Sequence, residues 1–170
     1  MTLWTSRSER ERGFTDYVSA RHGHLWRIAY ALCGNRDQAD DLLQTALTKL
    51  YVAWPRMHAV ENPDAYVRQI LVRSNIDESR RPWRREVPVA EHPDSPARQP
   101  PELDGGDAVM AALSELAPMQ RRCVVLRHWL DLSVADTAAA LGVSEGTVKS
   151  HTSRGVARLQ SLLVEVAEHG

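Results

Sequence analysis

A proline-rich stretch near the middle of the chain limits what the chain can fold into. Between Arg84 and Asp107 the sequence reads RREVPVAEHPDSPARQPPELDGGD, which holds five of the nine prolines and ends on a Gly-Gly pair. Proline removes a backbone donor and biases the residue before it away from helix, so no helix should cross this stretch. An ordered surface loop within one domain is the less favoured alternative at this length. We therefore expect a linker over residues 84–106 between two domains, residues 10–83 and 107–166.

Both domains are expected to be helical. Apolar residues recur at helical spacing in seven segments, residues 14–32, 35–54, 62–81, 107–115, 118–129, 133–141 and 145–167. Residues that commonly cap helices precede several of them, namely Asn35 or Asp37, Asn62, Ser133 and Ser144. No stretch shows the sustained period-two alternation of a strand. The sequence therefore predicts an all-α fold of two small helical domains.

Several classes of protein are disfavoured by composition. Cys33 and Cys123 are too few and too far apart to suggest a disulfide scaffold or a zinc site. The first residues lack the apolar core of a signal peptide, and no apolar run approaches the ~18 residues of a membrane span. We expect a cytoplasmic protein with no membrane insertion, no metal and no cofactor.

The second domain carries a helix-turn-helix pattern in LSVADTAAALGVSEGTVKSH. Ser133 is placed to cap a short helix, with Asp136 completing a capping-box pattern. Gly142 allows a tight turn, and Ser144 is placed to cap the next helix. Small alanines in the first helix let the second helix cross it closely. This arrangement is typical of a DNA-binding helix-turn-helix.

The second of these helices has one polar face opposite its apolar stripe. Long cations suit phosphate contacts or guanine readout, and short hydroxyl side chains allow a close approach to the groove, although an ordinary solvated face is the alternative. The candidate DNA-contacting residues are Thr147, Lys149, Ser150, Ser153, Arg154 and Arg158. The net charge of −1 lacks the basic surplus of a free-standing DNA binder. Another component would therefore have to supply much of the affinity.

The first domain carries two further polar surfaces. The second predicted helix has an acidic, amide-rich stripe that suits either a protein contact or solvent: Asp37, Asp40, Asp41, Gln44, Thr48 and Lys49. The third predicted helix and the residues after it are locally basic, which suits DNA that is being opened: Arg68, Arg73, Arg80, Arg81, Arg84 and Arg85. Trp83 either stacks on an unpaired base or closes the edge of the domain.

Together these segments resemble the extracytoplasmic-function (ECF) sigma-70 factors. RDQADDLLQTALTKLYVAW is similar to their region 2.1–2.2, NPDAYVRQILVRSNIDESRRPWRR to region 2.3–2.4, and LSVADTAAALGVSEGTVKSHTSRGVARL to region 4. Thr45 follows Gln44 where the family often has Glu, a form that resembles the SigE-like subgroup of actinobacteria. The resemblance implies an RNA polymerase sigma factor, not an enzyme, that directs core polymerase to promoters and assists DNA melting.

The resemblance also implies partners and sites. The partners would be core RNA polymerase, through its β′ clamp and β flap, and promoter DNA; the sequence leaves open whether an anti-sigma factor binds. The implied polymerase-docking residues are Asp40, Asp41, Gln44 and Lys49. Those implied at the −10 element are Arg73, Ser74, Asn75, Asp77, Arg80 and Arg81, and the loop at about Met57–Pro63 would capture a flipped base. The 145–158 helix would read the −35 element.

Two alternatives come from other functional classes. The helix-turn-helix segment alone also fits a response-regulator-type regulator that binds promoter duplex by itself, but no receiver-domain strands or phosphoacceptor pattern precede it. A helical metalloenzyme could use His22, His24 and Cys33. Side chains at i and i+2 of a helix do not face each other, which disfavours that reading.

Overall fold

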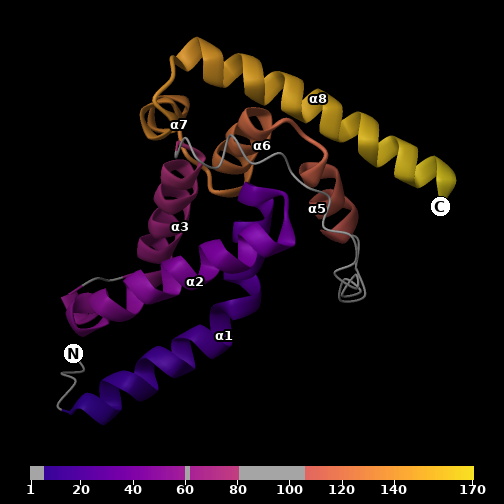
Figure 1. The fold of residues 1–170 in the computed structure, drawn as a ribbon. Helices are drawn as coiled ribbons and strands as arrows, with labels where there is room; N and C mark the ends of the chain where they lie inside the picture. Colours follow the sequence, from indigo (N-terminus) through magenta and orange to yellow (C-terminus); the bar gives the residue numbers. More distant parts are fainter. Residues whose placement is uncertain (1–5, 60–61, 81–105) are drawn as a thin grey trace. The chain divides into compact units, whose positions relative to one another are not determined.

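The structure is a computed structural model that describes residues 6–59, 62–80 and 106–170. The chain divides into two compact units, residues 1–75 and 76–170. Within the described ranges every regular element is a helix, which confirms the predicted fold class (Figure 1). None of these helices is both long and apolar enough to cross a membrane. The expected linker lies outside the described residues except for Gly106, so its conformation stays a prediction.

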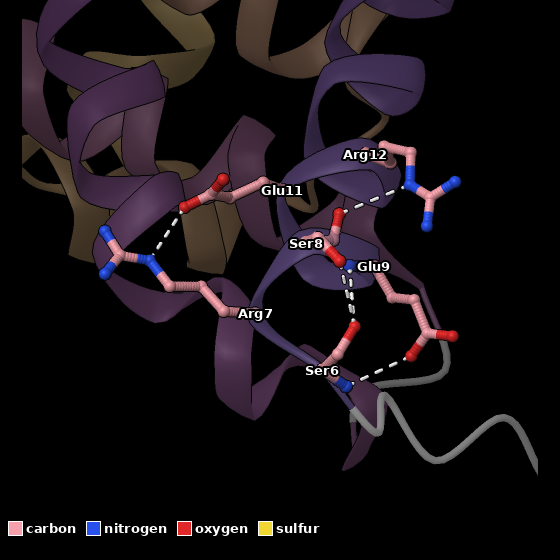
Figure 2. Close-up of polar contacts among 6 residues, drawn as sticks. All are labelled: Ser6, Arg7, Ser8, Glu9, Glu11 and Arg12. Carbon is pink, nitrogen blue, oxygen red and sulfur yellow. Dashed lines mark hydrogen bonds and ion pairs between the residues drawn. The ribbon is translucent and has the colours of Figure 1, made fainter.

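The first helix, α1 (Arg7–Cys33), begins two turns earlier than the expected start at about Phe14. Figure 2 shows the reason: Ser6 Oγ accepts a hydrogen bond from the Glu9 amide at 3.2 Å, and Glu9 Oε2 accepts one from the Ser6 amide at 3.1 Å. This reciprocal pair is a capping box. The predicted start was wrong because it followed the apolar stripe alone, whereas Ser-x-x-Glu marks the true beginning.

The first unit continues with α2 (Arg36–Ala53), η1 (Trp54–Ala59) and α3 (Pro63–Ser79), of which the residues from Ile76 on are counted with the second unit. Gly34, at φ 67°, ends α1, and the Asn35 side chain accepts from the Gln38 amide at 3.1 Å. Asn35 rather than Asp37 is therefore the cap of α2. Asn62 caps α3 as predicted, accepting from the amides of Asp64 and Ala65. The largest fully buried side chains of the unit are Leu25, Ile28, Leu32, Leu42, Leu43, Leu50, Val67 and Leu71.

A polar tie joins the first half of α1 to the beginning of α3. The Tyr17 hydroxyl donates to Asp64 Oδ1, and Arg21 Nη2 lies 3.0 Å from Asp64 Oδ2. Burial, followed by the hydrogen bond to Asp64, raises the pKa of the Tyr17 phenol. Next to this tie, the rings of Phe14 and Tyr17 lie 5.6 and 5.4 Å from the Trp54 ring. The early turns of α1 therefore hold both η1 and the start of α3.

The second unit packs shorter helices along one long helix (Figure 1). Its elements are α5 (Gly106–Ser114), α6 (Pro118–Val124), η2 (Val125–Trp129), α7 (Val134–Leu141) and α8 (Glu145–His169). The segment predicted as one helix over 118–129 ends in a π turn, η2, with the Leu130 amide donating to the Val125 carbonyl. The side chains of Ser133 and Ser144 cap α7 and α8 as expected.

Two glycines shape the second unit. Gly142 ends α7 at φ 67°, a left-handed conformation that suits glycine and forms the expected turn. Gly155 of α8 lies against α6, where an added Cβ would stand 2.6 Å from Val124 Cγ2 and 3.2 Å from the Gln120 carbonyl oxygen. Only a residue without a Cβ permits this approach, so Gly155 sets the spacing of α6 and α8.

Candidate functional site

The acidic stripe of α2 forms one exposed face. Asp40, Asp41 and Gln44 are exposed, and they lie within about 100° of one another around the helix at about 100° per residue. The residues between them, Leu42 and Leu43, are buried against the rest of the unit. The structure therefore brings together three of the four predicted docking residues. We call Asp40, Asp41 and Gln44 the α2 face.

A tryptophan on α1 supports this face. Trp26 Nε1 donates a hydrogen bond to Asp40 Oδ1 at 2.7 Å, which leaves the other carboxylate oxygen for a partner. The Trp26 ring stacks on Tyr30 at a centroid distance of 5.3 Å, and the Arg36 guanidinium lies 6.0 Å from the indole centroid. Sequence reasoning missed Trp26 because its partner lies on another helix. No pattern within α1 or α2 alone marks this contact.

Lys49, the fourth predicted docking residue, lies elsewhere on α2. It lies about 140° around the helix from Gln44 but about 80° from Asp41, at about 100° per residue, and about 12 Å beyond Asp41 along the axis at about 1.5 Å per residue. Its ammonium group is 3.0 Å from the Ser74 hydroxyl of α3. Lys49 therefore belongs to the surface where α2 meets α3 and not to the α2 face.

The predicted −10 residues of α3 fall into two groups. Arg73, Asp77 and Arg80 are exposed and recur at the i, i+4 and i+7 positions of one face. Ser74 and Asn75 are only 3% and 6% exposed. Ser74 meets Lys49, and the Asn75 side-chain amide lies 3.6 Å from the Cys33 sulfur. Arg81 and Trp83 lie outside the described residues, as does part of the loop at 57–63.

The predicted −35 residues lie on the exposed side of α8. Val148 and Gly155 are buried on the opposite side, where the apolar stripe was expected. Thr147 is half-buried, and its amide and hydroxyl both contact the Ser144 hydroxyl in the cap of α8. The exposed members are Lys149, Ser150, Ser153, Arg154 and Arg158. We call these five residues the α8 face.

A shallow depression adjoins the α8 face. Lys149 and Ser153 line one side of it, and Arg127 and His128 of η2 line another. Arg127 also donates to the Leu132 carbonyl, which holds its side chain over the turn before α7. Sequence reasoning missed both η2 residues, because their approach to α8 depends on how α6 packs. They add basic side chains to the edge of the α8 face.

The residues suggested for a metalloenzyme do not form a site. His22 and His24 are exposed on α1, whereas Cys33 is buried at its end. In the described ranges no group of three or more His, Cys, Asp or Glu side chains is placed to hold a metal ion. Burial also raises the pKa of the Cys123 thiol, which opposes a nucleophilic role.

Family models cover both units. The model for Sigma-70 region 2 matches residues 17–85, and that for Sigma-70, region 4 matches residues 106–159. The first match includes the α2 face and α3, and the second includes the whole α8 face. The response-regulator-type alternative is not supported, since it gives no account of a region 2 match in the first unit.

Full-length relatives agree with these matches. The RNA polymerase sigma-E factor of Streptomyces coelicolor is 41% identical over 152 residues, covering 89% of this chain and 86% of that protein. The ECF RNA polymerase sigma factor SigM of Mycobacterium tuberculosis is 31% identical over 157 residues, covering 88% and 76%. Among solved structures, the sigma factor RpoE of Bartonella quintana, crystallised with the anti-sigma factor NepR, aligns with a TM-score of 0.57, 28% identity and coverage of 89% and 97%. The chain belongs to the ECF family of RNA polymerase sigma-70 factors.

Proposed function

We propose that this sigma factor divides promoter recognition among three surfaces on its two units. The α2 face docks on the β′ clamp of core polymerase, α3 acts at the −10 element, and the α8 face reads the −35 element. The observation that carries this proposal is that an acidic face and a cationic face lie on separately packed units, within matches to different sigma regions. Because the two units pack separately, the α2 face of one unit can bind a protein while the α8 face of the other unit binds DNA.

The α8 face suits duplex DNA. Lys149, Arg154 and Arg158 offer charged donors for phosphates or guanine edges. Ser150 and Ser153 lie between these cations and are short enough for the helix to enter a major groove. Thr147 acts through the cap that fixes the start of α8. Arg127 and His128 would add phosphate contacts at the edge.

The α2 face suits a partner with cationic and donor groups. Asp41 and Gln44 are exposed, and Asp40 is held in place by Trp26 with one oxygen left over. A pre-positioned carboxylate loses little side-chain entropy on binding. Core polymerase then supplies the non-specific DNA grip that a chain of net charge −1 lacks.

On α3, direct contacts to DNA at the −10 element are assigned to the exposed residues Arg73 and Asp77, and also to Arg80 and Arg81. The Arg80 guanidinium donates to the Leu141 carbonyl at 3.4 Å and would have to leave it to reach DNA. Ser74 and Asn75 lie beneath this face and act by positioning it, since their side chains already have partners inside the first unit. Opening of DNA requires contacts to phosphates and to exposed bases, for which cations on an exposed helix face are suited.

This role makes the chain a polymerase subunit rather than an enzyme. Nucleotide addition belongs to the core polymerase, so the chain supplies addressing and assists melting in the cytoplasm, where chromosome and polymerase meet. The solved complex of RpoE with NepR supports a further partner of the same kind, an anti-sigma factor.

Run-off transcription with purified core polymerase and a panel of promoter fragments tests the proposal. We expect promoter-specific transcripts only when the chain is added. The opposite result is no transcript from any fragment, together with tight and specific duplex binding by the chain alone. That result would restore the response-regulator-type reading.

Two substitutions separate the roles of the units. Arg154→Ala should lose −35-dependent transcription and keep core binding, because it removes an exposed cation of the α8 face. Asp41→Ala should weaken core binding, because it removes an exposed carboxylate of the α2 face. If Arg154→Ala abolished core binding instead, this division of labour would be wrong.

A further inference from the structure

We propose that Lys49 contacts the phosphate backbone of promoter DNA beside α3, and that the buried Ser74 hydroxyl positions it there. The proposal rests on the assignment of α3 to the −10 element. It removes Lys49 from the polymerase-docking set and gives a residue of α2 a role in DNA opening.

The position of Lys49 supports this role. It lies about two turns beyond Asp41 along α2, about 12 Å at about 1.5 Å per residue. A partner that contacts Asp40, Asp41 and Gln44 therefore need not extend to Lys49. Lys49 instead reaches α3, where its ammonium lies 3.0 Å from Ser74 Oγ.

The contact with Ser74 fixes the direction of the ammonium group. Ser74 is 3% exposed, whereas Lys49 is an exposed residue. An ammonium has three donors, and the Ser74 oxygen accepts one of them. The remaining donors are available at the surface. A long, flexible side chain is thereby held at its tip, which reduces the entropy that a phosphate contact would cost.

The neighbouring charges favour an anion at this position. Ser74 follows Arg73 directly and lies one helical turn from Asp77, so the Lys49 ammonium flanks the exposed stripe of Arg73, Asp77 and Arg80. Two arginines against one aspartate leave that stripe cationic. A compact ammonium adds a point charge of the kind that phosphates bind. A strand lying here would therefore meet Lys49 of α2 and Arg73 of α3, whereas the Arg80 guanidinium donates to the Leu141 carbonyl.

The test uses the full chain reconstituted with core polymerase, on a promoter fragment first identified by run-off transcription. Lys49→Ala is compared with Lys49→Gln, Lys49→Arg and Ser74→Ala. Core affinity is measured by titration of labelled protein. Promoter opening is measured by permanganate reactivity as holoenzyme is titrated at each of a series of salt concentrations, which gives both the open fraction at saturation and the promoter-binding constant K. Circular dichroism confirms that each variant folds.

We expect Lys49→Ala and Lys49→Gln to leave core affinity within about twofold of wild type. The fraction of open promoter should fall several-fold. The slope of log K against log salt concentration, where K is the promoter-binding constant of the holoenzyme, should become shallower by about one, the value for one lost phosphate contact. Lys49→Arg should retain most of the activity because it keeps the charge. Ser74→Ala should show a smaller loss of opening without a change in core affinity.

Two control variants keep this proposal separate from the assignments on which it rests. Asp41→Ala reports the docking surface, and Arg73→Ala reports the −10 role of α3. If Arg73→Ala left opening unchanged, the α3 assignment would fail. If Arg73→Ala lowered opening but Lys49→Ala lowered core affinity as Asp41→Ala does, or changed neither quantity, the Lys49 proposal alone would be overturned.

Discussion

At the scale of single residues, the indole of Trp26 fixes the orientation of the Asp40 carboxylate. An exposed aspartate normally samples several rotamers, and a binding partner must select one of them. Here the bond from Trp26 Nε1 to Asp40 Oδ1 holds one rotamer, while Tyr30 stacks on the ring that makes the bond. In the proposed docking role, the carboxylate would be positioned before its partner arrives.

Trp26→Phe tests this preparation. An aromatic ring able to stack on Tyr30 is kept, but the donor to Asp40 is lost. Core affinity should therefore fall by about twofold to tenfold, the usual net worth of one hydrogen bond. In an Asp40→Ala background the same change should have no further effect. Trp129→Phe, in the second unit, controls for the loss of a tryptophan. Equal losses of affinity in both backgrounds would contradict the coupling.

Gly155 is the second residue whose replacement has a defined consequence. Gly155→Ala places a Cβ 2.6 Å from a methyl group of the buried Val124, a β-branched residue with little freedom to move. Overpacking of this kind costs about 1–3 kcal/mol, which exceeds the gain of up to about 1 kcal/mol from replacing a helical glycine. Thermal unfolding should show a lower Tm for the second unit.

Gly146→Ala is the matched control on the same helix. The nearest atom to its added Cβ is Ser144 Oγ at 3.9 Å, so nothing has to move. We expect the unfolding free energy to stay unchanged or to rise by up to about 1 kcal/mol. If both variants behaved alike, the close approach of α6 and α8 would not be what requires glycine at position 155.

At the scale of elements, the tie between α1 and α3 predicts a dependence on alkaline pH. The pKa of Tyr17 is raised in the folded chain above its ordinary value of 10.0, mainly by burial and by the bond to Asp64. Below about pH 10 the phenol is protonated in both states, and the tie contributes fully. As the pH rises further, the unfolded state releases the proton more readily than the folded state, so stability falls.

Tyr17→Phe isolates this contribution. The difference in unfolding free energy between wild type and Tyr17→Phe should stay constant from pH 7 to 9 and shrink above about pH 10, measured by denaturant titration. The matching comparison is between Asp64→Asn and the double variant Asp64→Asn/Tyr17→Phe. Their difference in unfolding free energy should shrink less above about pH 10, because Asp64→Asn removes the carboxylate that opposes phenolate formation. A wild-type difference that stays constant to pH 11 would contradict the raised pKa.

Most elements were predictable because their boundaries are local. Asn35, Asn62, Ser133 and Ser144 lie directly before apolar helical stripes, and all four cap helices in the structure. The start of α1 was missed because its first turns carry no apolar stripe, although Ser6 and Glu9 form a capping-box pattern there. The π turn η2 was missed because it is set by tertiary packing, which overrides the helical pattern.

The candidate sites were predictable only in part, and for a related reason. Exposure along α8 follows largely from its own periodicity, so the five exposed members of the α8 face could be assigned from sequence, whereas Thr147 is half-buried in the cap. Ser74 and Asn75 look like polar surface residues in sequence, but their partners, Lys49 and Cys33, lie on other helices. The same holds for Trp26 and Asp40. The sequence pattern within one helix carries no information about its contacts with other helices, so these contacts could not be predicted.

At the scale of the whole molecule, near-neutral charge predicts dependence on polymerase. With 21 Lys and Arg against 22 Asp and Glu, the chain has little long-range attraction for DNA. We expect the chain alone to bind a −35 duplex only with the affinity typical of non-specific binding, about 10⁻⁴–10⁻⁶ M at physiological salt. Fluorescence anisotropy with matched and scrambled duplexes measures this. Tight, sequence-specific binding without polymerase would contradict it.

The two-sided build of α8 has a consequence for how such factors diverge. Its exposed cations and hydroxyls lie on one side, while Val148 and the close contact of Gly155 lie on the other. Surface substitutions away from packed features usually change stability by less than about 0.5 kcal/mol. After gene duplication, a copy could therefore acquire a new promoter preference through changes at Ser150, Ser153 or Arg154 alone. Its regulon could drift while its architecture is inherited unchanged.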